Sequence, residues 1–204
     1  LGDVYKRQLV GGMNASDCYN TDWWETFIDP STGDEKSRLV EITFMYKGLD
    51  SEIPIYLSGL NELKILRLEG NFLTGGIPTE ITTLENLEVL KVQNNLLTGN
   101  IPDNIGTLTK LDTLWLYSNQ LDGSIPESIT NLNTLTNLRL ELNNLSGEIP
   151  SNIGNMTNLR RLRFDWNNLT GEIPESIGNL INLTKLYGGN NNLSGEIPES
   201  LCNI

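Results

Sequence analysis

Residues 60–83 read LNELKILRLEGNFLTGGIPTEITT, and this 24-residue stretch recurs along most of the chain. New copies begin, without insertion or deletion, at Leu60, Leu84, Leu108, Leu132, Met156 and Leu180. A weaker copy precedes them from Lys36 to Gly59, and Ile204 stands where a further copy would begin. A fixed period of this size is typical of an array whose units bury their apolar faces only by stacking on one another.

The apolar residues recur at fixed positions when each copy is numbered from 1. Position 4 is leucine in every copy, position 7 is Leu or Ile, and positions 14, 18 and 22 are aliphatic. Positions 6 to 10 alternate, with 7 and 9 apolar and 8 and 10 mostly polar, which indicates a short β-strand with one buried face. Stacked copies would pair these strands into a parallel sheet, with positions 6, 8, 10, 11 and 13 facing outward and free of packing.

Two further columns punctuate the unit. Position 12 is asparagine in six copies, at Asn71, Asn95, Asn119, Asn143, Asn167 and Asn191. A buried amide without partners costs roughly 1–3 kcal/mol, so we expect these side chains to bond backbone groups where the chain leaves the strand. Positions 16 to 19 read G-x-I-P in the same copies, where the Gly permits a turn and the Pro removes a hydrogen-bond donor.

The consensus L-x-x-L-x-x-L-x-L-x-x-N-x-L-[ST]-G-x-I-P-x-x-[IL] resembles the plant-type leucine-rich repeat. The resemblance implies an α/β repeat solenoid, a right-handed curved superhelix with a parallel sheet on the concave face and turns and 3₁₀ segments on the convex face. Similar chains are ectodomains of receptor-like kinases and receptor-like proteins, and secreted inhibitors of cell-wall-degrading enzymes. The resemblance therefore implies recognition without catalysis, at an extracellular or cell-surface location, although no signal peptide is visible in this sequence.

The chain divides into three parts. Residues 1–16 are predicted to be a disordered or non-native leader, because they have no place in the repeat and LGDVYKRQ resembles translated adaptor sequence. Residues 17–35 are predicted to form an N-terminal cap over the first leucine layer, with apolar area from Trp23, Trp24, Phe27 and Ile28. The repeats occupy 36–204. Because Leu201 and Ile204 are ordinary repeat residues, we expect a truncated array with an exposed last layer.

Composition excludes several classes of function. The net charge is −12, which argues against a nucleic-acid partner, since phosphate backbones demand clustered Lys and Arg. The sequence contains no run of about 18 apolar residues, the length needed to span a membrane. The chain has no histidine, which removes His-dependent triads and most zinc sites. Cys18 and Cys202 lie at opposite ends of the expected solenoid, too far apart for a disulfide. We therefore expect no catalytic residues, no metal and no cofactor.

The outward positions of the sheet carry the candidate site. Positions 6 and 8 hold six of the 14 basic residues, whereas glutamates gather at positions 17 and 20. Arg and aromatic residues dominate binding hot spots, so the predicted ligand-binding residues are Arg67, Lys91, Trp115, Tyr117, Arg139, Arg161, Arg163, Asp165, Trp166, Lys185 and Tyr187. The competing interpretation is a merely soluble face, on which Glu69, Glu141 and Asp165 neutralise neighbouring Arg in exposed pairs worth about 0–1 kcal/mol.

Three functions compete for this face. The first is a peptide or protein ligand bound on the concave side. The second is an acidic glycan, held either by a polysaccharide binder or by an inhibitor of a polysaccharide-degrading enzyme. The third is an adhesion or ice-binding protein, which the regular Asn and Thr/Ser columns suggest but which charged and aromatic columns suit poorly. Six N-x-[ST] sequons also occur, at Asn14, Asn144, Asn155, Asn168, Asn182 and Asn192.

One copy departs from the packing pattern. Gly188 stands at position 9, where the other copies place Phe, Leu or Val. The missing side chain would leave a void worth about 2–5 kcal/mol, unless Phe164 in the same column leans into it.

Overall fold

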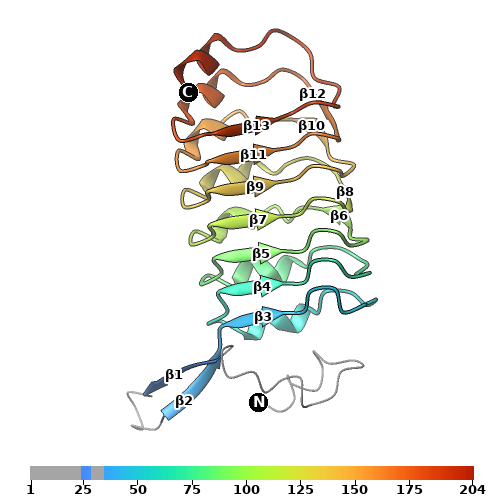
Figure 1. Cartoon of the computed structure of the whole chain (residues 1–204), viewed down its shortest axis with the longest axis vertical. Helices are drawn as coiled ribbons and strands as arrows, with labels where there is room; N and C mark the ends of the chain where they lie inside the picture. The colour runs from blue at the N-terminus through green and yellow to red at the C-terminus, as the bar shows by residue number, and fades with distance from the viewer. Residues whose placement is uncertain (1–23, 29–34) are drawn as a thin grey trace.

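The computed structural model describes residues 24–28 and 35–204. Each copy forms one coil of a solenoid, and the strands of successive coils lie side by side (Figure 1). Seven strands make one parallel sheet in the order β13-β11-β9-β7-β5-β4-β3. Their bounds are β3 (Glu41–Thr43), β4 (Ile65–Arg67), β5 (Val89–Lys91), β7 (Thr113–Trp115), β9 (Asn137–Arg139), β11 (Arg161–Arg163) and β13 (Lys185–Tyr187). The predicted solenoid class is confirmed.

The strands cover positions 6 to 8 of each copy and pair in exact repeat register. Arg67 lies opposite Lys91, Trp115 opposite Arg139, and Arg139 opposite Arg163. Neighbouring strands are about 4.8 Å apart. Every position of the repeat therefore becomes a straight column of side chains across the sheet.

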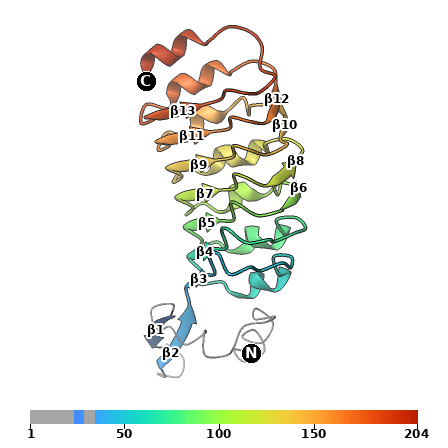
Figure 2. The same cartoon turned by 45° about the vertical axis from the view of Figure 1, so that its right-hand side comes forward.

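Short 3₁₀ helices lie on the side opposite the sheet (Figure 2). They are η3 (Ile55–Gly59), η4 (Thr79–Thr83), η5 (Ile105–Thr107), η6 (Glu127–Asn131), η7 (Ile153–Asn155), η8 (Glu175–Asn179) and η9 (Glu199–Asn203). A proline stands immediately before five of these helices, namely Pro54 of the weaker copy and the G-x-I-P prolines Pro78, Pro126, Pro174 and Pro198. Pro78 shows the extended conformation that ends the preceding segment (ψ 139°). The glutamates of position 20, Glu127, Glu175 and Glu199, are exposed here, away from the strands.

Two smaller parallel sheets were not predicted. β6 (Thr98–Asn100) pairs with β8 (Gln120–Asp122), and β10 (Ser146–Glu148) pairs with β12 (Asn168–Thr170). These strands cover positions 13 to 17, where the G-x-I-P glycine suggests only a turn. The main chains of adjacent coils nevertheless come close enough to form hydrogen bonds between strands, so a second edge of the solenoid is also stabilised by β-pairing.

The core runs without interruption through the coils. Leu66, Leu90 and Leu114 of the position-7 column are fully buried between the sheet and the 3₁₀ helices. Phe164 is buried beside Gly188 and fills the space that a side chain there would take. The expectation that Phe164 compensates for this glycine is confirmed.

The asparagine column forms the predicted ladder. Asn95 Nδ2 donates hydrogen bonds to the carbonyl oxygens of Val92 (2.9 Å) and of Leu68 in the previous coil (3.0 Å). Asn95 Oδ1 accepts a hydrogen bond from the backbone N–H of Leu73 (3.0 Å). The same bonds recur at Asn119, Asn143, Asn167 and Asn191. Each amide therefore joins two coils through backbone groups that every copy possesses.

The two ends of the solenoid differ from its middle. β1 (Trp24–Ile28) pairs antiparallel with β2 (Glu35–Leu39) just before the first coil. The predicted leader, residues 1–16, and most of the predicted cap, residues 17–35, lie outside the described residues, so this division of the chain stays a prediction. At the other end Ile197 is 76% exposed, whereas Ile149 in the same column is 4% exposed, because the last coil has a neighbour on one side only.

Candidate ligand-binding surface

The outward face of the sheet carries one row of side chains from position 8, here named the position-8 row. The strands β4, β9 and β11 bury their central residue and leave the flanking ones half-buried, so positions 6 and 8 share the outward face. The row comprises Thr43, Arg67, Lys91, Trp115, Arg139, Arg163 and Tyr187.

Cations of this row contact aromatic rings of the row and of position 10. Lys91 Nζ lies 3.9 Å from the ring centre of Trp115, and Arg139 Cζ lies 5.4 Å from the same centre on the next strand. Arg139 Cζ also lies 3.7 Å from the ring centre of Tyr117, and Arg163 Cζ lies 4.8 Å from that of Tyr187. Cation–π contacts of this kind are worth about 0.5–1 kcal/mol at exposed sites. The side chains of the row therefore attract one another across neighbouring strands.

A second row lies beneath it at position 10, where the sequence led us to expect outward-facing residues. Glu141 is 1% exposed, and Glu69, Gln93 and Asp165 are also buried. The chain turns out of the strand after position 8, so these side chains pass under the long arginine side chains instead of reaching solvent. The expectation that position 10 is free of packing was wrong.

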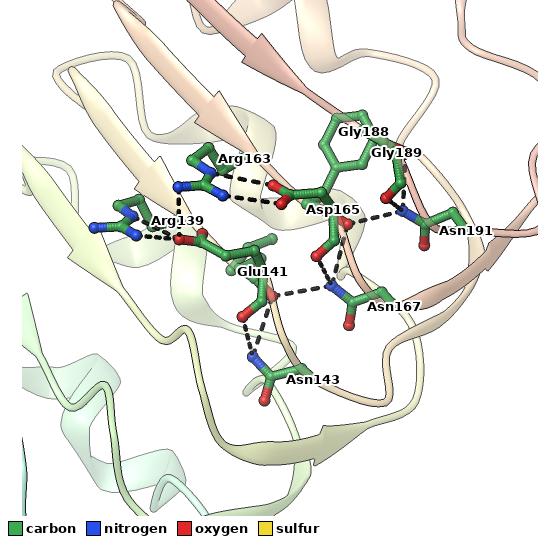
Figure 3. A network of polar contacts seen from close by, with 11 residues as sticks. Arg139, Glu141, Asn143, Arg163, Asp165, Asn167, Gly188, Gly189 and Asn191 are labelled. Carbon is green, nitrogen blue, oxygen red and sulfur yellow. Dashed lines mark hydrogen bonds and ion pairs between the residues drawn. The ribbon is translucent and has the colours of Figure 1, made fainter.

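Arginines of the position-8 row bind these buried carboxylates (Figure 3). Arg139 donates from Nε (2.8 Å) and Nη2 to Glu141 Oε1, and Arg163 Nη1 lies 3.4 Å from the same oxygen. Arg163 also donates from Nε (3.1 Å) and Nη2 (2.9 Å) to the two oxygens of Asp165. Arg67 makes the equivalent contact with Glu69 at 2.8 Å.

These ion pairs differ from the exposed pairs of the competing interpretation. The side chain of Arg139 is 17% exposed and that of Glu141 is 1% exposed. Removing one partner from a buried pair leaves an uncompensated charge, so the pairs are fixed parts of the surface. The hydrogen bonds that Arg163 donates to the carboxylate of Asp165 raise the pKa of Arg163 above its usual value. Burial, followed by repulsion from Arg67, lowers the pKa of Lys91.

Several buried polar atoms on this face have no hydrogen-bond partner among the described residues. They all belong to positions 6, 8 and 10 and are Glu69 Oε2, Gln93 Oε1, Trp115 Nε1, Asn137 Oδ1 and Glu141 Oε2. Buried polar groups are nearly always paired with protein, water or ligand. Gln93, Asn137 and Glu141 were absent from the predicted site. The pattern Arg-x-Glu at Arg139 and Glu141 could have indicated the last of them.

Three of the eleven predicted ligand-binding residues lie neither on the position-8 row nor directly beneath it. Arg161 and Lys185 lie opposite each other at position 6 of β11 and β13. Trp166 lies at position 11, beyond the end of β11, and lines a hollow of about 420 Å³. The other eight predicted residues lie on the position-8 row or directly beneath it, at Arg67, Lys91, Trp115, Tyr117, Arg139, Arg163, Asp165 and Tyr187.

Position 11 has a backbone conformation that the sequence did not indicate. Its residues adopt positive φ in all seven copies, at Tyr46, Gly70, Asn94, Ser118, Leu142, Trp166 and Asn190. The left-handed region is uncommon for bulky side chains such as Leu and Trp. This turn places position 11 at the edge of the sheet face and aims the next residue, the ladder asparagine, inward.

The chain belongs to the leucine-rich repeat family. A family model described as a leucine-rich repeat region matches residues 45–186, and a second, described as a leucine-rich repeat, matches residues 182–204. No curated protein matches the chain. Several of the solved structures that it resembles are ectodomains of plant receptor kinases.

Three of these structures define the resemblance. The ectodomain of GASSHO1/SCHENGEN3 from Arabidopsis thaliana is 37% identical, with a TM-score of 0.74, over 81% of this chain and 19% of that one. The ectodomain of HAESA from Arabidopsis is 36% identical, with a TM-score of 0.72, over 80% and 27%. Pollen Receptor Kinase 3 is 30% identical, with a TM-score of 0.73, over 88% and 85%. The chain thus spans less than a third of the first two.

Within residues 24–28 and 35–204, no helix is long and apolar enough to cross a membrane. In the same ranges, no group of three or more His, Cys, Asp or Glu side chains is placed to hold a metal ion.

Proposed function

We propose that this chain is a non-catalytic, extracellular recognition module, part of a receptor-like or secreted protein, and that it binds a peptide or protein on its sheet face. Two similar ectodomains support this class of ligand. The GASSHO1/SCHENGEN3 structure is a complex with CASPARIAN STRIP INTEGRITY FACTOR 2, and the HAESA structure is a complex with an IDA peptide hormone. The binding residues proposed here are those of the position-8 row from Arg67 to Tyr187, with Tyr117 and Asp165 supporting them and Arg161 and Lys185 beside them.

The observation that carries the proposal is the state of Trp115. Its ring lies between the cations of Lys91 and Arg139, while its Nε1 is buried and has no partner among the described residues. Gln93 Oε1 and Asn137 Oδ1, which also have no partner among the described residues, lie at positions 10 and 6 of the two neighbouring copies. An aromatic ring with an unpartnered N–H, with unpartnered acceptors in the neighbouring copies, can be complemented by a peptide that brings its own N–H and C=O groups.

Charge and spacing limit the ligand further. Positions 6, 8 and 10 carry six cations and four carboxylates, whereas the whole chain carries a net charge of −12. The face is therefore mildly cationic and suits a peptide with an acidic and an apolar residue. The strands β5 to β11 span roughly 14 Å, which about four or five extended residues would cover.

The test is a binding screen with matched variants. A displayed library of random short peptides is selected on the wild-type protein, and selected peptides are titrated against Trp115→Ala, Lys91→Ala and Lys110→Ala. Lys110→Ala is the control, because it removes the same charge from an exposed side chain, whose ammonium group donates a hydrogen bond to Asn86. We expect Trp115→Ala to weaken binding by about 2 kcal/mol, or roughly 30-fold, and Lys110→Ala to leave it unchanged.

A parallel titration with an acidic and a neutral oligosaccharide separates the second candidate. Arg161 and Lys185 have no ion pair with any described residue, and this pair of cations favours carboxylate or sulfate groups. Salt-sensitive binding of the acidic oligosaccharide alone, lost in Arg161→Ala, would support a glycan binder. Selected peptides that bind all three variants equally would contradict the peptide proposal.

A further inference from the structure

Trp166 lies apart from the position-8 row, in a different chemical setting. Its side chain is 55% exposed and makes no ring or cation contact with a described residue. It lines the hollow of about 420 Å³ together with Leu142 and a set of amides. The exposed side-chain amides of Gln120, Asn144, Asn168 and Asn190 have no hydrogen bond to any described residue. The hollow thus offers one aromatic face and several free amides, with no charged side chain in its lining.

The sequence around this hollow contains a modification motif. Residues 166–170 read WNNLT, so Asn168, Leu169 and Thr170 form an N-x-T sequon and Trp166 stands two residues before the acceptor. Such sequons are acceptors for N-linked glycans on the surfaces of secreted proteins. In β12, Asn168 and Thr170 are exposed while Leu169 between them is buried. The period of two therefore places the acceptor amide and the threonine hydroxyl on the exposed side of the strand. Asn168 also lines the hollow that Trp166 lines.

The other described sequons lack this neighbour. Two residues before Asn144 and Asn192 stand Leu142 and Asn190, at the same left-handed position as Trp166. The residues two before Asn155 and Asn182 are Ile153 and Leu180, both buried in the core. Among the sequons that the structure describes, only Asn168 has an exposed aromatic residue two positions before it. The repeat consensus generates the sequon, but it does not generate the tryptophan.

We propose that Asn168 carries an N-linked glycan and that its first sugar packs against the indole ring of Trp166. The proposal rests on the extracellular location included in the proposed function. Asn168 Nδ2 forms a bond to the anomeric carbon of the N-acetylglucosamine of a lipid-pyrophosphate-linked oligosaccharide. The bond from that carbon to the phosphate oxygen breaks, the lipid pyrophosphate leaves, and Nδ2 loses one proton. A transferase of the secretory pathway supplies this donor.

The physical reason is the match between the sugar and the ring. A pyranose presents C–H groups on one face and hydroxyl groups at its edge, while Trp offers a large flat apolar surface. Stacking covers the ring, and the amides of Gln120, Asn144 and Asn190 in the same hollow can bond the sugar hydroxyls. The glycan would then occupy the edge of the sheet face at position 13. It would leave the position-8 row open and would remove Trp166 from the ligand-binding set.

The experiment uses the full chain secreted from a eukaryotic cell with an added signal peptide. Glycopeptide mass spectrometry measures occupancy at each sequon, and we expect Asn168 to be modified. Four proteins then form a thermodynamic cycle: wild type, Thr170→Ala, Trp166→Asn and the double variant. Thr170→Ala removes the sequon and keeps Asn168. Trp166→Asn introduces the residue type that the copy beginning at Leu180 has at this turn, Asn190.

Loss of the glycan is expected to lower Tm by about 2 °C more when Trp166 is present than in the Trp166→Asn variant. The same four proteins made in bacteria, without glycan, should show no such coupling. A matched control, Ser194→Ala, removes the sequon of Asn192 and should not couple to Trp166. Trimming the glycan to its first sugar should leave the coupling intact.

Unmodified Asn168 in the secreted protein, or equal Tm changes with and without the tryptophan, would overturn the proposal. Coupling of Trp166 to the glycan of Asn144 in place of Asn168 would also overturn it. None of these readouts involves the peptide ligand. Failure of peptide binding with the coupling present would therefore count against the proposed function alone.

Discussion

Asn143 and Glu141 lie two residues apart, and both are buried, yet their hydrogen bonding differs completely. Asn143 Nδ2 donates to the carbonyl oxygens of Leu116 and Leu140 at 3.1 Å, and its Oδ1 accepts from the N–H of Leu121 at 3.0 Å. Glu141 Oε1 binds two arginines, while its Oε2 has no partner among the described residues. Asn143 therefore has hydrogen-bond partners for both atoms of its amide, whereas Glu141 has partners for only one of its two carboxylate oxygens.

The difference follows from the kind of partner. The ladder asparagines bond main-chain groups, which are present in every copy, so one geometry serves all six positions. The residues of positions 8 and 10 bond side chains that vary from copy to copy, so each coil has its own arrangement. Columns that repeat therefore build the solenoid, and columns that vary can change without altering it.

The largest effect on stability is expected from Asn143→Ala. It leaves the buried N–H of Leu121 without a partner, which costs about 1–3 kcal/mol. It also removes one of two hydrogen bonds from each of the carbonyl oxygens of Leu116 and Leu140, which keep those from Asn119 and Asn167. We expect the free energy of unfolding, measured by urea denaturation, to fall by about 3 kcal/mol. The control Asn144→Ala changes an exposed neighbour and should cost less than about 0.5 kcal/mol. Equal losses in the two variants would break the distinction.

Arg139 and Arg163, the two partners of Glu141, allow a second test. From the sequence alone, Arg139→Ala with Arg163→Ala would abolish ligand binding and leave Tm nearly unchanged. The structure changes this expectation, because Glu141 loses both of its cationic partners. We expect the double variant to lose binding of the selected peptides and about 2 kcal/mol of stability in urea, less than for a fully buried pair since both arginines are partly exposed.

Adding Glu141→Gln to this double variant separates the two losses. Removal of the buried charge should restore most of the stability but none of the peptide binding. If the triple variant remains as unstable as the double variant, the arginines stabilise the sheet by packing and not by pairing with Glu141. Recovery of binding in the triple variant would show that neither arginine contacts the ligand.

The same distinction explains what could be predicted from the sequence. The columns of Leu66, Asn95 and the G-x-I-P prolines were placed correctly, because their physical roles repeat six or seven times. Burial of Glu141 was missed, since alternation in a strand predicts an outward residue at position 10 and the chain leaves the strand at position 8. Positive φ at Leu142 was missed for a related reason. The residue type argues against it, and only the Gly and Asn of other copies in that column indicate it.

The smallest expected effect comes from this left-handed column, which builds the fold yet varies in sequence. Leu142 has φ 58° and is about half exposed, so its side chain gains little from burial while its backbone is strained. We expect Leu142→Asn to raise the free energy of unfolding by about 0.5–1 kcal/mol. The reverse exchange, Asn94→Leu at φ 56°, should lower it by a similar amount. Urea denaturation measures the free energy of unfolding of both variants. A loss of stability in Leu142→Asn would show that contact with the hollow around Trp166 outweighs the backbone strain, and position 11 would then belong with the columns that serve a ligand.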